Sequence, residues 1–194
     1  MLVIVSFFLA CCNMQAMNLK ILIYSVIFYI LIYLIGANLF GTFSLDKYHF
    51  SVFLPSGAMV FMALVIESCG ILGIVLGSLL ISIFYLSEPS IAISIGNALL
   101  IGAGLWTARK LSTCALGLNN NFGGINLKQI ICIIFIFVAI NTLIVQVFYF
   151  VLNPGNDFFL EFAEKLISNL LGAFLVLLLI RISVHSHQFF FKKI

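Results

Sequence analysis

Charge is what this sequence has least of. Only 8% of its 194 residues are charged, 64% are hydrophobic, and the formal net charge is +3. A soluble chain of this length cannot bury so much apolar surface in one core, so the composition excludes a soluble globular protein. The basic excess is also too small and too dispersed for nucleic-acid binding. The sequence therefore predicts a protein whose solvent is the lipid bilayer.

Motifs for catalysis and metal binding are lacking as well. The sequence contains no Walker loop, no HExxH or GxSxG motif, and no kinase or cyclase signature. His185 and His187 have no cysteine or acidic partners, which makes them a weak metal signal. The five cysteines form no CxxC pair: Cys11, Cys12, Cys69, Cys114 and Cys132. We expect no catalytic residue, no metal, no cofactor and no structural disulfide.

Uncharged apolar runs, in contrast, fill the chain. About 20 such residues cross the roughly 30 Å hydrocarbon core of a membrane as a helix. We therefore expect an all-α polytopic domain of about six transmembrane helices over residues 21–183. The predicted helices cover 21–40, 55–66, 71–86, 91–107, 130–152 and 158–182. Asn126 is the predicted cap of the fifth helix, with entry at Leu127. Residues 1–20 are treated as an N-terminal extension that is possibly not the native start, and 184–194 as a short basic cytoplasmic tail.

Two of the predicted helices are short. A single helix over residues 55–86 would be about 48 Å long, well beyond the hydrocarbon thickness. We therefore expect two helices in a tight hairpin, with the turn at Ser68–Gly70. Pro55 favours a helix start, because proline is tolerated in a first turn and disfavours the helical conformation of its predecessor. Residues expected at close helix contacts are Pro55, Gly57, Gly70, Gly73, Gly77 and Gly96.

The basic residues predict the orientation. With six crossings and a cytoplasmic N-terminus, every lysine and arginine except Lys47 and Lys165 falls on the cytoplasmic side. Such a bias is typical of membrane proteins, in which cytoplasmic loops are enriched in basic residues. We expect a multi-pass protein of the bacterial inner membrane with both termini in the cytoplasm.

Several polar side chains fall at membrane depth. Asn97, Asn141, Gln146 and Asn169 are candidates for contact with a ligand or a partner and for a polar interior, and the sequence leaves open whether they converge on one cavity. Hydrogen bonding between helices is the alternative role for such amides. Glu67 is a further candidate, because a carboxylate in the bilayer is costly and is usually functional. A solvated turn residue is the alternative at that position.

The predicted sixth helix begins with acidic residues. Glu161 and Glu164 in the first turns favour the positive end of the helix dipole. Glu161 also has the i, i+4 spacing for an ion pair with Lys165. An acidic rim that attracts a cation is the alternative.

Four segments in the middle of the chain carry a resemblance to a known family. The segments are Leu54–Gly57, Gly70–Gly77, Ile95–Asn97 and Trp106–Leu111, followed by Asn169–Gly172. In order and spacing this pattern resembles the MASE1 family of bacterial integral membrane sensory domains. It departs from the family in having no tryptophan before Pro55, Leu100 in place of an acid, and Asn169 in place of an aspartate.

The resemblance implies a non-enzymatic, sensor-like module. Family members usually precede a signalling domain, so a stand-alone module implies action through a membrane or cytoplasmic partner protein. Two other functions fit the size and the short helices. One is a small-molecule-binding subunit similar to those of energy-coupling-factor vitamin transporters, and the other is a structural subunit of a larger membrane complex.

Overall fold

The protein is a bundle of α-helices. The computed structural model describes residues 19–40, 52–86, 90–117, 126–154 and 157–191, and side chains as far as residue 179. Within these ranges the helices are α2 (Leu19–Phe40), α3 (Pro55–Val65), α4 (Glu67–Phe84), α5 (Ile91–Leu116), α6 (Leu127–Leu152) and α7 (Phe158–Phe191). The predicted all-α fold is confirmed. Most of the proposed N-terminal extension, residues 1–18, lies outside the described part.

Five of these helices are long and apolar enough to cross a membrane, namely α2, α4, α5, α6 and α7. The sixth, α3, has only 11 residues, which corresponds to about 16 Å or half of the hydrocarbon thickness. Large apolar side chains remain exposed along all the long helices, as on Ile27, Phe135 and Leu178. Lipid suits such surfaces and water does not, and the chain is a polytopic membrane protein.

Local signals set several helix ends. Pro55 begins α3, as the sequence predicts. Asn126 caps α6, and Gln129 completes a capping box in which each side chain binds the backbone N–H of the other residue. This cap is also confirmed. Gly117 ends α5 in the left-handed conformation, with φ of +59°.

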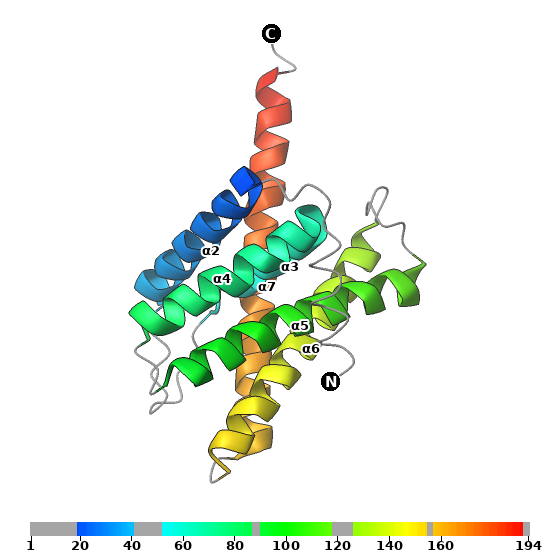
Figure 1. Ribbon diagram of the computed structural model, residues 1–194. Coiled ribbons are helices and arrows are strands. Elements are labelled where there is room, and N and C mark those ends of the chain that lie inside the picture. The colour runs from blue at the N-terminus through cyan, green and yellow to red at the C-terminus, as the bar shows by residue number, and fades with distance from the viewer. Residues whose placement is uncertain (1–18, 41–51, 87–89, 118–125, 155–156, 192–194) are drawn as a thin grey trace.

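The largest differences from the predicted helix lengths are in α5 and α7. The α5 helix continues beyond Thr107 to Leu116, so Arg109 and Lys110 lie inside it rather than in a loop. The reason is that arginine and lysine are good helix formers, and no stop signal occurs before Gly117. The α7 helix continues beyond Ile182 to Phe191, and its C-terminal part projects beyond the other helices (Figure 1).

The predicted turn at Ser68–Gly70 is wrong, because these residues belong to the first turn of α4. The chain changes direction one step earlier, between Ile66, which ends α3, and Glu67, whose φ is +59°. Gly70 serves close packing instead. A methyl group added there would collide with the Met62 carbonyl oxygen of α3.

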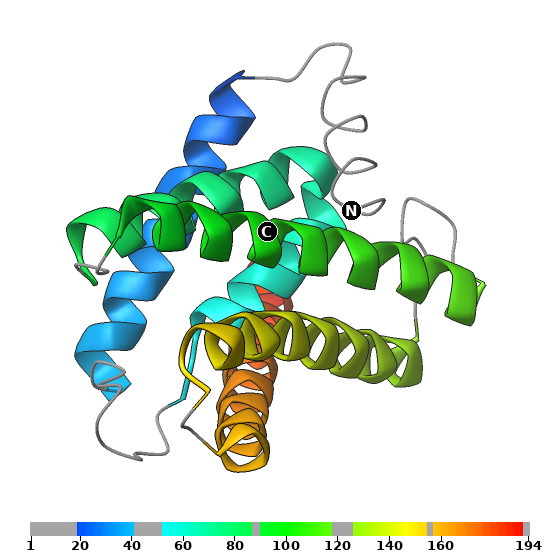
Figure 2. The ribbon, with the colours of Figure 1, turned by 60° about the horizontal axis from the view of Figure 1, so that its bottom comes forward.

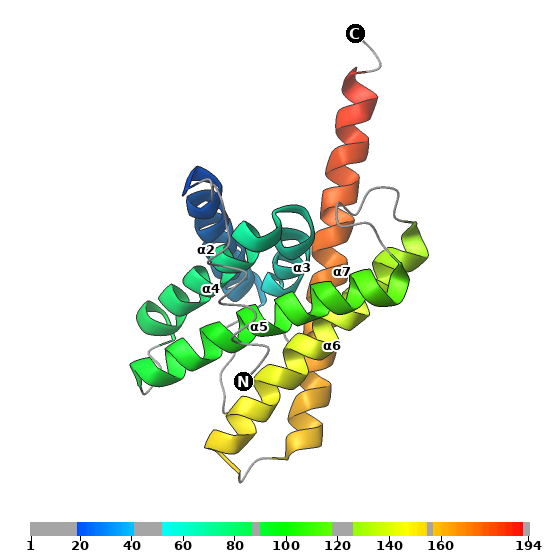
Figure 3. The same ribbon diagram turned by 45° about the vertical axis from the view of Figure 1, so that its right-hand side comes forward.

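The short helix α3 lies in the centre of the bundle. It contacts each of the other five described helices, and it is enclosed by them in two views (Figures 2 and 3). Pro55, Ala58, Met62 and Ala63 on this helix are all buried. Most of the core therefore forms around a helix that is too short to span the membrane.

The first turn of α3 packs against the middle of α7. The Phe53 N–H donates to the Ser168 carbonyl oxygen over 3.2 Å, and the Ser56 hydroxyl donates to the Asn169 carbonyl oxygen. Ser168 lies about 15 Å along α7 from its first residue. Gly172 makes this approach possible, since an added methyl group would collide with the Phe53 carbonyl oxygen.

Small residues also allow close packing between the outer helices. On α4, Gly73 faces Ser25 of α2, and a methyl group added at Gly77 would lie 2.7 Å from the ring of Tyr29. The same device recurs between α5 and α6, where Gly96 faces the ring of Phe148. Without a hydrophobic drive between helices in lipid, such close packing supplies much of the association energy.

We expect Gly172→Ala to lower the free energy of unfolding by about 1–3 kcal/mol, because the new methyl group meets backbone that cannot move aside. The matched control is Gly96→Ala, whose methyl group would meet only the tip of the Phe148 ring. Unfolding in mild detergent with increasing SDS measures both. Equal stability of the two variants would contradict the tight α3–α7 contact.

Candidate functional site

Polar side chains pair along the interface between α6 and α7. Asn169 donates to the Thr142 hydroxyl over 2.8 Å, and Lys165 donates to the Gln146 side-chain oxygen over 2.7 Å. The two pairs are four residues apart on each helix and run in opposite directions, which is the register of antiparallel helices. Two of the predicted residues, Gln146 and Asn169, therefore lie on one polar seam between α6 and α7.

At one end of the seam, three side chains form a closed cluster. The Gln146 side chain is 1% exposed, and its amide nitrogen donates to Glu161 Oε2 over 2.8 Å. Lys165 Nζ lies 3.4 Å from the same carboxylate oxygen, which confirms the predicted Glu161–Lys165 pair. The Lys165 ammonium thus occupies the position that a cation attracted by Glu161 would take. It also lies 5.5 Å from the centre of the Tyr149 ring.

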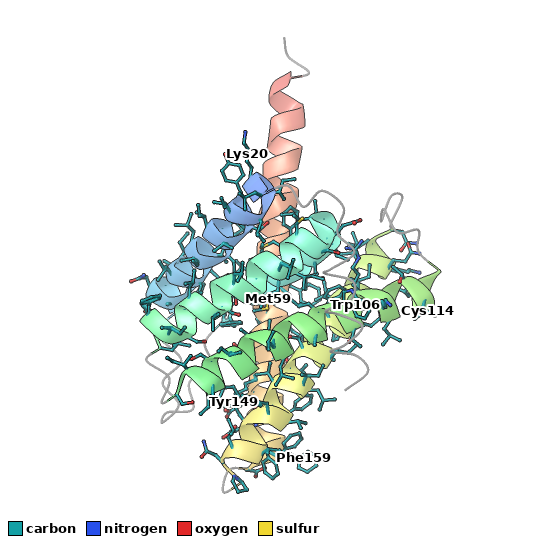
Figure 4. The ribbon with its side chains drawn as sticks, in the orientation of Figure 1. Lys20, Met59, Trp106, Cys114, Tyr149 and Phe159 are labelled. Atoms are coloured by element: carbon teal, nitrogen blue, oxygen red, sulfur yellow. The ribbon has the colours of Figure 1, made fainter. Side chains whose placement is uncertain are left out.

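At the other end, the seam reaches the centre of the bundle. A small cavity there is lined by Ser56, Met59, Val60, Leu105, Phe137, Val138, Asn141 and Asn169. Met59 lies in the interior of the molecule (Figure 4). The cavity volume is about 10 Å³, at the lower limit of what one water molecule needs.

Asn141 connects three helices at this point. Its amide nitrogen lies 3.9 Å from the Met59 sulfur of α3. Its side-chain oxygen is buried, has no hydrogen-bond partner among the described residues, and lies 3.0 Å from where a methyl group on Gly104 of α5 would be. The amide therefore packs directly against the α5 backbone, where only glycine leaves room for it.

The four candidate amides do not all line the described cavity. Only Asn141 and Asn169 do so. Gln146 lies in the cluster with Glu161 and Lys165, and Asn97 lies elsewhere in the core, 9% exposed, with a side-chain oxygen that makes no hydrogen bond to the described residues. The physical reason is the position of Asn97 along α5. Asn97 precedes Gly104, the residue that faces Asn141, by two helical turns, or about 10 Å.

Glu67 lies far from the polar seam, at the joint of α3 and α4. Its Oε1 is 2.8 Å from Arg109 Nη2, and the other terminal nitrogen of that guanidinium donates to the Ala63 carbonyl oxygen over 3.2 Å. The Glu67 side chain is half-exposed. It is thus neither a lone carboxylate in lipid nor a purely solvated turn residue.

Sequence reasoning missed Ser56, Thr142 and Arg109 as members of these clusters. A signal existed for two of them, because Ser56 follows the proline that begins α3 and Thr142 adjoins Asn141. Arg109 gave no signal, because it follows the position where α5 was predicted to end.

Comparison with known proteins finds no similarity to report: no protein-family model matches the chain, and neither does any curated protein or solved structure. Among the described residues, no three histidine, cysteine, aspartate or glutamate side chains lie close enough together to hold a metal ion. The described polar groups offer hydrogen bonding and ion pairing, and those are the properties from which a function has to be argued.

We expect Lys165→Met to destabilise the protein by about 1–3 kcal/mol, because it leaves the Glu161 carboxylate without its ammonium partner in a largely buried site. Adding Glu161→Gln should recover most of this loss, since a neutral amide no longer needs the cation. SDS unfolding of the single and double variants measures the recovery. Additive losses would show that the pair is not coupled.

Proposed function

We propose that this protein is a non-enzymatic, sensor-like module, resembling MASE1 domains, that acts through a membrane or cytoplasmic partner protein. The observation that carries the proposal is the small size of the cavity at the centre of the described helices. This cavity is about 10 Å³, whereas pockets for small molecules usually measure about 300–1,000 Å³. A protein without internal room for a ligand acts through its surface.

The small size of this cavity disfavours the vitamin-transporter alternative, which requires a larger ligand pocket among the helices. A structural subunit of a larger complex remains the second candidate, and the exposure of α2 favours it. Only 17% of the most apolar window of α2 is buried, against 50% for α4. The part of the α2 surface that does not pack against α3 or α4 is apolar and is available to lipid or to another subunit.

We further propose the bacterial inner membrane as the location, with both termini in the cytoplasm. The basic residues support this orientation, because Lys20, Arg109, Lys110 and Lys128 fall on one side of the membrane when the segment between α2 and α4, which contains the short helix α3, returns the chain to the cytoplasmic side. Lys20 and Phe159 lie at opposite ends of the molecule (Figure 4). Phe158 and Phe162 stack beside Phe159, which suits an aromatic belt at the outer interface.

Reporter fusions test the orientation. We expect phosphatase fusions to be active when joined after residue 156, in the proposed outer loop, and inactive after residue 120. Fluorescent-protein fusions should give the reverse pattern, since they fluoresce only in the cytoplasm. An active phosphatase after residue 120 would overturn the orientation and the membrane model that depends on it.

Recovery of a partner tests the function. We expect an affinity-tagged protein, purified in mild detergent after crosslinking, to retain a signalling protein. Asn97→Leu should leave membrane insertion intact but reduce that recovery about 5–10-fold, which corresponds to about 1–1.4 kcal/mol of binding free energy. The reason is that Asn97 has an unpaired buried oxygen that a partner-bound state can use.

The matched control is Asn38→Leu, because the exposed Asn38 amide bonds only to the Leu34 carbonyl oxygen of its own helix among the described contacts. Its recovery should equal that of the parent protein. Unchanged recovery with Asn97→Leu would reduce Asn97 to a packing residue. Copurification of a bound small molecule, or of an ATPase complex, would favour the transporter function instead.

A further inference from the structure

The joint between α3 and α4 holds a strained residue. Glu67 has φ of +59°, a left-handed conformation that glycine adopts readily and other residues adopt at a cost. Ile66 before it is still near helical, with φ of −95° and ψ of −8°. Such strain persists only where the surroundings fix the backbone.

Arg109 of α5 contacts both sides of the joint. Its Nη2 is 2.8 Å from Glu67 Oε1, at the first residue of α4. Its Nη1 donates to the Ala63 carbonyl oxygen, in the last turn of α3. A cation is favourable beside the C-terminal carbonyls of one helix and beside an acid at the N-terminus of the next. One guanidinium therefore connects the two helices across their bend.

We propose that the Glu67–Arg109 pair is a conformational clasp, which holds the bend between α3 and α4 in its left-handed form and lets the bend open when the pair separates. The clasp lies at the edge of the bundle. The Glu67 side chain is 51% exposed and that of Arg109 is 15% exposed, so the carboxylate is accessible from outside the bundle while the guanidinium is largely buried.

Opening of the clasp affects more than the turn itself. The α3 helix contacts every other described helix, and its last turn is the part that Arg109 holds. Movement of that turn therefore changes the packing at the centre of the bundle. Gly70 lies against the Met62 carbonyl oxygen, so it leaves room for α3 and α4 to pack together while the clasp is closed. This inference stands on the contacts alone and does not depend on the proposed partner.

Cys69 provides a reporter, because it is half-buried and lies two residues after Glu67. The experiment uses the full chain with the four other cysteines changed to serine, in membrane vesicles, and follows labelling of Cys69 by a water-soluble maleimide. We expect Arg109→Gln and Glu67→Gln each to raise the initial labelling rate about fivefold or more, since local opening exposes the thiol. The double variant should label no faster than either single variant.

Lys110→Gln is the matched control. It removes a neighbouring cation of α5 that lies 3.9 Å from the centre of the Trp106 ring, and the labelling rate should not change. Glu67→Gly should label more slowly than Glu67→Gln, because glycine adopts the left-handed turn without strain.

Two results would overturn the clasp. One is a parent-like labelling rate in Glu67→Gln, and the other is an equal increase in Lys110→Gln. Gel filtration confirms that each variant is folded. If Arg109→Gln does not fold, the half-exposed Glu67→Gln variant decides the question by itself.

Discussion

Close approach of helix backbones is the constraint on which the rest of this structure depends. In lipid, helices gain little from burying apolar side chains against each other, so association relies on tight packing and on hydrogen bonds between helices. Gly172 lets the start of α3 reach the backbone of α7, and Gly73 lets α2 reach α4. These contacts place a helix of 11 residues in the centre of the bundle, where neighbouring helices shield it from lipid.

Polar residues work within the same constraint. Each amide or charge in the bilayer needs a partner, because an unsatisfied polar group there is costly. Gln146 meets this need with Glu161 and Lys165, and Asn169 meets it with Thr142. The pairs fix the antiparallel register of α6 and α7.

Local sequence signals were sufficient to predict several features of the fold. The helices of the all-α fold follow from apolar runs, the start of α3 from Pro55, the cap of α6 from Asn126, and the Glu161–Lys165 pair from its spacing. Each depends on residues within one or two helical turns. The errors concern longer distances. The sequence predicts the turn at Ser68–Gly70, whereas the structure has the bend at a left-handed Glu67 beside Arg109 of a different helix.

The sequence by itself determined that the chain is a membrane protein made of helices, because composition and run length decide whether lipid or water is the solvent and which segments span it. It also determined which residues are polar at membrane depth. Only the tertiary structure decided how they combine, separating Asn97 from Asn141 and joining Glu67 to Arg109. The physical reason is that side-chain partners depend on the rotation and crossing of helices about one another. Contacts between residues distant in the chain set that geometry, and periodicity within one helix does not encode it.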